Sequence, residues 1–423
     1  MKIAVIGAGI IGITTAYELA VDGHEVTVFE RRSAAAEETS FANAGVVSPG
    51  SVTPWAAPGM PGKVLGNLLS RHAAVKLSLP LSGSDLAWMW KWWRACKLET
   101  HLLNRARMQS LAFYSRERLH HLTAELKLEY DRAEGYTVLL RSEKDRALVQ
   151  PGLQVLRDAG VSFSEINADE VRKIEPAINP DTAFLGGIHL PNDEVANCRQ
   201  FALLLKDIAR HLGVNFQFNT TVANINSAQA ASIFIAGEST PRQFDRIVVC
   251  AGLASAALLK PLGLKIPVAA VYGYSISAPI REALNAPRSA LMDERYKVAI
   301  SRLGNRVRVA GSAELGGTLG KHRASSIQTL YKVLHDWFPA AAKHTSSNAN
   351  TGASVQVWKG ARPMLPDGPP VIGDSGIAGI WLNIGHGSSG WALSCGSARV
   401  LADVMSGKAA DINTDGFAIS RIS

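Results

Sequence analysis

The amino-terminal stretch, residues 2–30, reads KIAVIGAGIIGITTAYELAVDGHEVTVFE. Its first apolar run, residues 3–6, does not alternate with polar residues, which is typical of a strand buried on both faces of a parallel sheet. Apolar residues then recur at helical spacing between 13 and 20, and a second apolar run at 25–29 predicts another strand. The stretch therefore predicts a βαβ unit, in which one helix joins two parallel strands.

Three glycines in GxGxxG spacing lie between the first strand and the helix. In this motif Gly7 permits a tight turn, Gly9 lets the backbone approach a pyrophosphate, and Gly12 lets helix and strand pack closely. The helix N-terminus offers unpaired N–H groups to the phosphates. Glu30, which follows the second strand, can accept hydrogen bonds from both ribose hydroxyls. The unit predicts dinucleotide binding, and by itself it does not separate FAD from NAD.

Composition narrows the class of protein. The chain has 423 residues, of which 47% are hydrophobic and 19% charged, and this predicts two or three globular domains rather than a disordered protein. The net charge of +8 is mild for this length and favours anionic small molecules or a membrane surface over a protein that wraps nucleic acid. The four cysteines form no CxxC pair, so we expect a reducing compartment and neither a disulfide scaffold nor a zinc site. No run of about 18 apolar residues predicts a membrane-spanning helix.

The pattern of strand, glycine turn and helix recurs far along the chain. It returns at 246–252 and again after residue 355, whereas residues 266–312 alternate as in an antiparallel sheet. Helices are expected at 84–97 and 104–127. Because the doubly wound pieces lie at the beginning, the middle and the end, a second domain must be inserted between them.

Short runs spread over nearly the whole chain carry a resemblance to a known family. They are VIGAGIIGITTAYELA (5–20) with Glu30-Arg31-Arg32, TSFANAGVVSPG (39–50), PNDEVANCRQF (191–201), VVCAGLAS (248–255), YGYSIS (272–277), WKGARPMLPDGPPVIG (358–373) and NIGHGSSGWALSCGSARVLADVMSG (383–407). In this order they resemble the D-amino-acid oxidase superfamily of FAD enzymes, and more closely its bacterial D-amino acid dehydrogenase branch of small-subunit type. Two runs depart from that branch. The PxDExGDC run loses a glycine and an acid within 191–198, and Tyr272 replaces the lysine of the KGYS run, which leaves the preferred substrate side chain open.

The resemblance implies an α/β fold in which FAD is bound by a Rossmann-like domain of the glutathione-reductase type, with an inserted α+β substrate domain built on an antiparallel sheet. The predicted FAD-binding domain comprises residues 1–80, 182–262 and 352–423, and the predicted substrate-binding domain comprises residues 81–181 and 263–351. The residues expected to bind FAD are Gly7, Gly9, Ile10, Ile11, Gly12, Glu30, Arg31, Arg32, Ser40, Asn43, Ala44, Gly45, Val222, Cys250, Ala251, Gly252, Arg362, Gly385, His386, Gly387, Ser388, Ser389 and Gly390. Where some members attach flavin through a cysteine, this chain has Pro363 and Met364, so we expect non-covalent FAD, and we expect no metal.

The implied chemistry needs a clamp for the substrate carboxylate, because a fixed carboxylate sets the direction of the Cα–H bond. Arg362 is the expected clamp, since a planar guanidinium binds a carboxylate bidentately; its alternative is an ordinary structural arginine. Tyr272 and Tyr274 are expected to share one face of a strand and to donate a hydrogen bond to the carboxylate, unless both only pack in the sheet. His386 is expected to modulate flavin or substrate protonation, or else to be a turn residue. The N–H groups of residues 388–390 would favour negative charge near the flavin N1–C2=O edge.

The resemblance implies oxidative deamination of a D-amino acid. Hydride passes from Cα to flavin N5, the imino acid hydrolyses to a 2-oxo acid and ammonia, and the electrons go to a quinone or another acceptor. No His/Asp pair indicates a general base, so we expect the amine to bind in its neutral form. Three alternatives stay open: a glycine- or sarcosine-type oxidase that uses oxygen, an RNA-modifying flavoenzyme, and a non-catalytic flavin-binding subunit. The chain shows no separate RNA-binding module, so we expect no nucleic-acid partner.

The segment SDLAWMWKWWRACK (84–97) carries four of the nine tryptophans, interleaved with Lys91, Arg94 and Lys97. Tryptophan together with basic residues suits the headgroup region of a membrane. The alternative is a helix between domains whose aromatic side chains are buried. We therefore expect a cytoplasmic protein, with peripheral contact to the inner face of the bacterial cell membrane as a further expectation.

Overall fold

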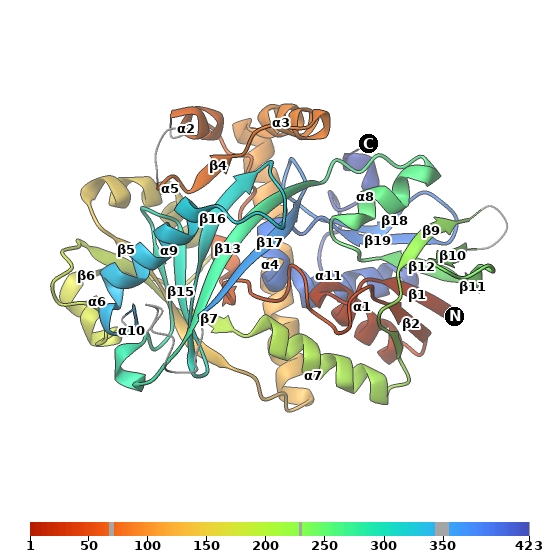
Figure 1. The fold of residues 1–423 in the computed structure, drawn as a ribbon, viewed down its shortest axis with the longest axis horizontal. Helices are drawn as coiled ribbons and strands as arrows, with labels where there is room; N and C mark the ends of the chain where they lie inside the picture. Colours follow the sequence, from red (N-terminus) through yellow and green to blue (C-terminus); the bar gives the residue numbers. More distant parts are fainter. Residues whose placement is uncertain (67–71, 228–230, 343–354, 423) are drawn as a thin grey trace.

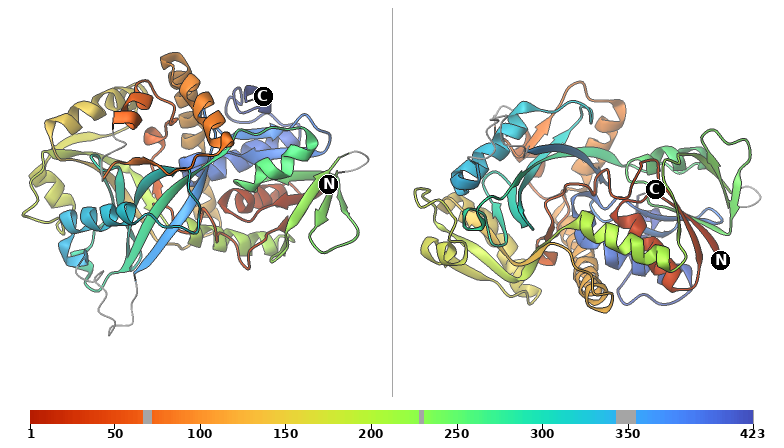
Figure 2. Two further views of the ribbon diagram at one scale, coloured as in Figure 1. Left: turned by 45° about the horizontal axis from the view of Figure 1, so that its top comes forward. Right: turned by 60° about the horizontal axis from the view of Figure 1, so that its bottom comes forward.

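The computed structural model describes residues 1–66, 72–227, 231–342 and 355–422. A six-stranded sheet and a ten-stranded sheet form the two ends of the molecule, and a three-stranded sheet lies beside the six-stranded one. Figures 1 and 2 show the two larger sheets apart from each other in all three views. The fold therefore has two bodies of structure with an interface between them.

The six-stranded sheet contains the predicted βαβ unit. Strand β1 lies at its centre, because it pairs in parallel with β2 on one side and with β12 on the other. The remaining neighbours are also parallel except β18 and β19, which are antiparallel. The order is β18 (Val371–Asp374), β19 (Ile380–Ile384), β12 (Arg246–Val249), β1 (Lys2–Ile6), β2 (Glu25–Phe29) and β8 (Asn215–Gln217).

Both faces of this sheet are buried, which confirms the prediction from its unalternating apolar run. Ile3 and Val5 pack on one face against helices, and Ala4 and Ile6 pack on the other face against the three-stranded sheet. The helices of the first face are α1 (Ile10–Val21), α4 (Leu98–Glu125), α7 (Cys198–His211) and α11 (Gly390–Met405). The other face is covered by β9 (Val222–Asn226), β10 (Ala231–Ile235), β11 (Arg242–Phe244) and α8 (Ala254–Leu259).

The ten-stranded sheet is mixed, whereas the sequence predicts an antiparallel one. Two of its pairs, β5 with β14 and β4 with β16, are parallel, and the others are antiparallel. Parallel pairs need long connections, and the partners in both of these pairs are far apart in the chain. The order is β17 (Gln356–Met364), β13 (Ala269–Pro279), β16 (Arg306–Leu315), β15 (Val298–Leu303), β14 (Ala290–Asp293), β5 (Arg132–Leu140), β7 (Gly186–Ala196) and β3 (Val46–Val47), with β4 (Val75–Leu77) on β16 and β6 (Ser164–Asn167) on β7.

Four strands of this sheet come from ranges that we assigned to the FAD-binding domain. They are β3, β4, β7 and β17, and each pairs with a neighbouring strand of the ten-stranded sheet. The chain therefore crosses between the two bodies at these strands. The domain boundaries stay a prediction, and the boundary between residues 351 and 352 lies outside the described residues.

Helices occur at both expected positions in the first third of the chain. Helix α3 begins after Ser82, whose side chain forms a capping box with Asp85, and α4 begins at Leu98, earlier than expected. Among the residues that the structure describes, no helix is long and apolar enough to cross a bilayer. The other helices are α2 (Met60–Gly66), α3 (Gly83–Ala95), α5 (Glu143–Asp158), α6 (Ala168–Ile174), α9 (Ala324–Trp337), α10 (Pro339–Ala342), η1 (Pro49–Ser51), η2 (Lys260–Leu262), η3 (Ala283–Asn285), η5 (Gly387–Ser389) and η6 (Ile419–Arg421).

Candidate active site

A cavity of about 860 Å³ is lined by residues of both larger sheets. All the side chains and backbone positions that the sequence predicts for FAD border this cavity, with the exception of Gly12. Arg362, Tyr272, Tyr274 and His386 border it as well. The structure therefore brings together positions that are spread from residue 7 to residue 390 of the sequence.

Gly7 and Gly12 are required by the fold itself. Gly7 has φ +104°, and a Cβ atom there would lie 2.7 Å from the carbonyl oxygen of Cys250. A Cβ atom on Gly12 would lie 1.8 Å from the carbonyl oxygen of Gly7. Gly12 thus lets α1 pack against the preceding turn, which explains why it does not border the cavity.

Gly9 differs from Gly7 and Gly12, because the fold does not require a glycine at this position. Its φ of −70° is open to any residue. The nearest atom to a Cβ on Gly9 would be Ser40 Oγ, at an ordinary contact distance of 3.4 Å. Ser40 Oγ itself accepts a hydrogen bond from the backbone N–H of Ile10, 3.0 Å away. A bare backbone facing the cavity at the start of α1 fits a diphosphate that approaches closely.

Glu30 is held at the edge of the cavity by backbone groups. Its two carboxylate oxygens accept hydrogen bonds from the N–H groups of Ala8 and Arg32, both at 2.8 Å. Each oxygen keeps a further lone pair that can accept from a ribose hydroxyl. Arg31 and Arg32 both pair with Glu38, so their charges are already matched within the protein.

The loop at residues 39–45 is fixed to the ten-stranded sheet. Thr39 Oγ1 donates to the carbonyl of Ala361 at 2.7 Å, and Ser301 Oγ donates to the carbonyl of Ala44 at 2.7 Å. Asn43 Oδ1 accepts from the N–H of Gly45 at 3.0 Å. The loop therefore presents small residues and backbone to the cavity in a fixed conformation, which fits the edge of a planar ring.

Two buried polar atoms at the cavity have no hydrogen-bond partner within the described chain. They are Asn383 Oδ1 and Trp391 Nε1. Buried polar groups are nearly always hydrogen-bonded, so such atoms indicate that a ligand or solvent completes the site. Together with the open backbone at Gly9, they show that the residues present fit a bound dinucleotide cofactor.

His386 is buried and neutral. Burial lowers the pKa of its imidazole to about 3, and only 3% of the residue is exposed. Its Nε2 lies 3.1 Å from Ser397 Oγ on α11. A histidine in this state does not carry a proton near neutral pH, so the geometry fits a fixed turn residue better than an acid catalyst.

Arg362 lies on β17 at the edge of the ten-stranded sheet. Its Nη1 donates to the carbonyl oxygen of Ser312 at 3.0 Å, and no acidic side chain pairs with it among the described residues. Burial without such a partner lowers the pKa of the guanidinium to about 10, so the group is still a cation near neutral pH. A desolvated cation that borders a cavity and keeps free donors fits an anionic ligand such as a carboxylate.

Gly273 on β13 makes room for this guanidinium, and the sequence analysis missed it. A Cβ atom on Gly273 would lie 2.4 Å from Nη2 of Arg362. The sequence does contain one signal for it, since Gly273 lies between the two candidate tyrosines, Tyr272 and Tyr274. Its role depends on the pairing of β13 with β17, which no local pattern reveals.

The two tyrosines lie on the other face of the sheet from Arg362. In the register of β13 and β17, Tyr272 pairs with Ala361 and Tyr274 pairs with Lys359, and successive residues of a strand point to opposite faces. Tyr274 is 1% exposed, and its hydroxyl donates to Glu314 and accepts from the N–H of Arg323. The expected shared face is therefore found, but it is not the face that carries the guanidinium.

Tyr272 and Tyr274 belong to a buried polar cluster that the sequence analysis also missed. Lys359 Nζ lies 3.0 Å from the carboxylate of Glu314 and 4.3 Å from the centre of the Tyr272 ring. Burial raises the pKa of Tyr272, and the negative charges of Asp85 and Glu314 add to this. The cluster joins β13, β16 and β17 on the side of the sheet that faces away from Arg362.

Comparison with known proteins agrees with this architecture. The sequence profile of the family described as DAO, FAD dependent oxidoreductase, matches residues 2–404. A D-amino acid dehydrogenase from Bradyrhizobium diazoefficiens is 40% identical over 423 residues, covering all of this chain and 99% of that protein. The fold is similar to that of glycine oxidase from Geobacillus kaustophilus and of iminodiacetate oxidase from Chelativorans sp. BNC1. Each has a TM-score of 0.73 at 21% identity, over 99% of this chain and 98% of the other. The chain belongs to the DAO family of FAD-dependent oxidoreductases.

Proposed function

We propose that this protein oxidises D-amino acids and passes the electrons to an acceptor other than oxygen. The observation that carries the proposal is Arg362, a cation without an acidic partner among the described residues, beside the cavity that fits FAD. The D configuration follows the relative that is 40% identical over the full length, which is a D-amino acid dehydrogenase. The products are a 2-oxo acid and ammonia, formed when the imino acid hydrolyses.

Arg362 binds the substrate carboxylate and thereby orients the Cα–H bond. Its position is fixed by the hydrogen bond to Ser312 and by the space above Gly273. A bidentate pair between guanidinium and carboxylate restricts the rotation of the bound substrate, so the Cα–H bond keeps one direction. The rotational entropy is then lost on binding and does not add to the barrier of the reaction. FAD, when bound, supplies the hydride acceptor for this bond.

Among the residues that the structure describes, we find no general base assigned to the substrate amine beside Arg362. His386, the nearest candidate from the sequence, is neutral, and its Nε2 is occupied by Ser397. The substrate amine therefore binds in its neutral form, and water takes the proton before binding. The start of α11, at Gly390, borders the cavity and favours negative charge there through its N–H groups.

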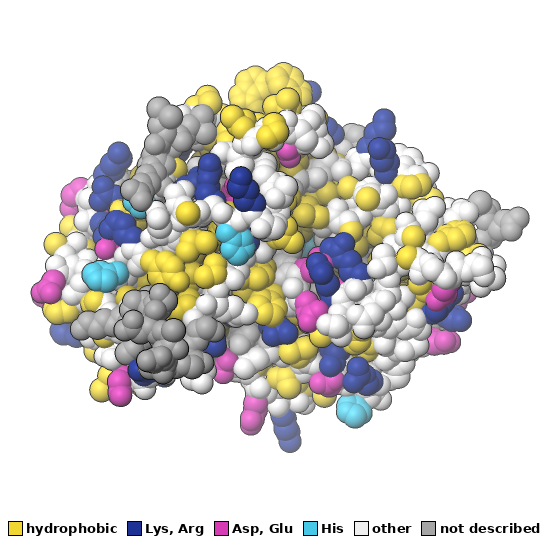
Figure 3. All heavy atoms as spheres, in the orientation of Figure 1, with side chains coloured by type: hydrophobic (Ala, Val, Ile, Leu, Met, Phe, Trp, Pro, Cys, Tyr) yellow, Lys and Arg dark blue, Asp and Glu magenta, His cyan; other side chains and the backbone are white. Residues whose placement is uncertain are grey.

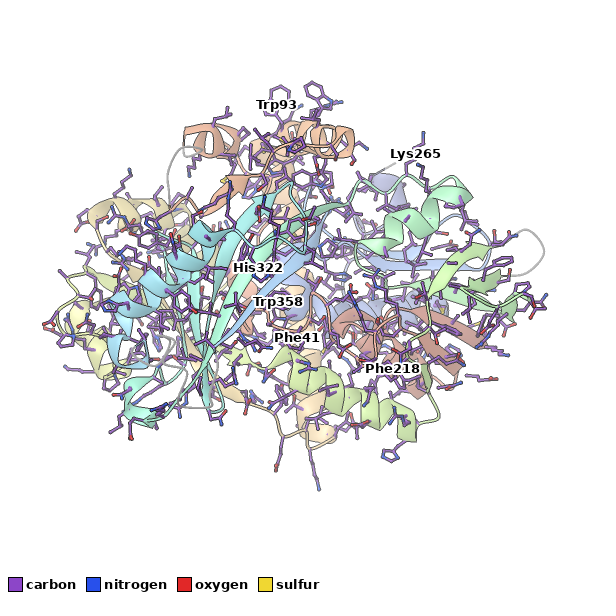
Figure 4. All side chains as sticks on the ribbon, viewed as in Figure 1. Phe41, Trp93, Phe218, Lys265, His322 and Trp358 are labelled. Carbon is purple, nitrogen blue, oxygen red and sulfur yellow. The ribbon has the colours of Figure 1, made fainter. Side chains whose placement is uncertain are left out.

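We further propose that the acceptor is a membrane quinone, reached by contact of α3 with an anionic bilayer surface. Trp90 and Trp93 of this helix are 57% and 55% exposed, and Lys91 and Arg94 are exposed beside them. Figure 3 shows hydrophobic side chains gathered at the top of the molecule, over α3, and Figure 4 labels Trp93 there. Tryptophan with basic neighbours is a combination that binds headgroups.

The activity is tested by anaerobic titration of the FAD-loaded protein with pairs of D- and L-amino acids, followed by the absorbance of oxidised flavin. We expect D-amino acids to bleach the flavin and their L-partners to leave it oxidised. Hydrogen peroxide is then measured during turnover in the presence of oxygen. This separates a dehydrogenase from an oxidase, because an oxidase forms one molecule of hydrogen peroxide for each substrate molecule oxidised. Bleaching by L-amino acids alone, or stoichiometric peroxide, would contradict the proposal.

The membrane contact is tested by sedimentation with vesicles of anionic lipid. We expect the protein to bind, and the Trp90→Ser/Trp93→Ser variant to lose binding while its activity with a soluble dye acceptor is kept. Trp88 on the same helix is 4% exposed and donates to the carbonyl of Met364, so it is left intact in this variant. Equal binding of the variant and the parent protein would remove α3 from the contact.

A further inference from the structure

Two glycines that face each other across β13 and β17 form a flat floor next to the carboxylate clamp. Gly273 and Gly360 are register partners, so their missing side chains would point to the same face of the sheet. The guanidinium of Arg362 occupies the space above Gly273. The indole of Trp358 occupies the space above Gly360, where a Cβ atom would lie 1.8 Å from Cη2 of the ring.

The guanidinium and the indole therefore lie side by side on one face of the sheet. Residues 358, 360 and 362 alternate along β17, so all three share this face. Partner Cβ positions in an antiparallel pair are about 5 Å apart, which places the two planar groups in adjacent positions. Both Trp358 and Arg362 border the cavity, and Figure 4 shows Trp358 where the two larger sheets meet.

The other cations near this face already have partners within the protein. Arg308 donates to Ser277 Oγ and to the carbonyl oxygen of Asn43, and Lys297, which borders the cavity, pairs with Glu294. Ala310 on β16, Ala299 on β15 and Met292 on β14 border the cavity and continue the row away from Arg362, each paired in register with the next. The ion pair of Lys359 and Glu314 lies on the opposite face, and Lys359 Nζ also donates to two backbone carbonyls, at 2.7 and 2.8 Å. A ligand clamped by Arg362 thus meets an aromatic ring, apolar side chains, and lysines that are already paired with acidic residues.

We infer that Trp358 forms the subsite for the substrate side chain, and that the substrate is an amino acid with one carboxylate and an apolar, preferentially aromatic side chain. The inference rests on the proposed function and names the substrate class of the same site. An aromatic side chain gains from packing on the indole. A second carboxylate or an ammonium group would be buried without an unpaired opposite charge, which disfavours acidic and basic substrates.

The first test compares substrates of the parent protein. We expect kcat/KM for D-phenylalanine and D-methionine to exceed that for D-glutamate and D-lysine by roughly 100-fold, the factor that an uncompensated buried charge gives. D-Alanine, which reaches Arg362 without filling the subsite, should lie between the two groups. Equal values for apolar and acidic substrates would overturn the inference, even if every D-amino acid bleaches the flavin.

The second test removes the indole. We expect Trp358→Ala to lower kcat/KM for D-phenylalanine by about 10- to 100-fold and that for D-alanine by less than about threefold, because only the larger side chain contacts the ring. Trp358→Phe keeps an aromatic floor and is the matched control. Gly360→Ala should imitate Trp358→Ala, since a methyl group there displaces the ring. Equal losses for both substrates would show that the indole only supports the sheet.

Binding of an unreactive ligand separates this inference from the proposed function. Calorimetric titration of the FAD-loaded protein with 3-phenylpropanoate and with glutarate measures the subsite without any redox step. We expect 3-phenylpropanoate to bind at least about tenfold more tightly than glutarate in the parent protein, and this preference to disappear in Trp358→Ala. If no amino acid bleaches the flavin but this preference is found, the activity is wrong and the subsite stands. If amino acids bleach the flavin and glutarate binds equally well, the subsite is wrong.

Discussion

Replacement of Arg362 by alanine isolates the contribution of the carboxylate clamp. The guanidinium uses one donor for Ser312 and keeps the others for a ligand, so it can form two charge-assisted hydrogen bonds to a carboxylate. Each such bond contributes roughly 1.5–3 kcal/mol. Two of them give roughly 3–6 kcal/mol, which corresponds to a loss in kcat/KM of about 10²- to 10⁴-fold at about 1.4 kcal/mol for each factor of ten.

The split between KM and kcat adds a second criterion. Because the clamp acts when the substrate binds, we expect most of the loss in Arg362→Ala to appear as a higher KM. Some loss in kcat should follow, since the Cα–H bond is no longer held in one direction. Arg362→Lys keeps the charge but lacks the planar fork, so it should recover only part of the activity.

The assay is steady-state reduction of a soluble dye acceptor, with FAD content measured for each variant from its absorbance. Arg302→Ala is a matched control. Arg302 lies on β15, donates to the backbone carbonyls of Gly304 and Ala283, and does not border the cavity. Near-parental kinetics for Arg362→Ala with normal FAD content, or an equal loss in Arg302→Ala, would refute the assignment of the clamp.

Three further outcomes follow from the cavity and its borders. Gly9→Val should yield protein without flavin absorbance, because the fold leaves only the cavity for the new side chain; a fully yellow variant would count against diphosphate binding at α1. Tyr272→Phe should change kcat/KM for D-amino acids by less than about threefold, since register places its ring on the other face from Arg362, and a loss as large as that of Arg362→Ala would show that its hydroxyl reaches the substrate. The pKa of His386 is lowered from 6.5 to about 3, so the neutral imidazole stabilises the fold above pH 6.5 and this stabilisation falls by about 1.4 kcal/mol per pH unit as the pH drops from 6.5 toward 3. The melting temperature of His386→Asn should therefore fall less than that of the parent protein as the pH drops across that range. If the melting temperatures of both proteins change equally with pH, the pKa of His386 is not lowered in the folded state.

The amino-terminal unit could be predicted because its signals are local. The apolar run, the glycine spacing and Glu30 all lie within thirty residues, and each depends only on its neighbours in the sequence. The same holds for the cavity-bordering positions at 385–390, which follow from a glycine turn before a helix.

The neighbourhood of Arg362 could not be predicted, because it depends on register between distant strands. Tyr272 lies on a strand, as expected, and Arg362, which we expected just after a strand, lies within one. The pairing of β13 with β17 puts Ala361 rather than Arg362 opposite Tyr272. A shift of one residue exchanges the faces of a whole strand, and no pattern within either strand fixes that shift. The same pairing assigns Gly273 and Gly360 their roles.

The ion pair of Lys359 and Glu314 anchors the edge strand β17 to the rest of the ten-stranded sheet. One face of the strand carries Arg362 and Trp358, and the other carries Lys359, which forms a buried ion pair with Glu314. Breaking that anchor would let the outermost strand move, and the clamp would move with it. If a substitution at Glu314 abolishes turnover, the melting temperature of the variant should be measured first. We expect it to be lowered, because the loss of activity then follows from a destabilised edge of the sheet.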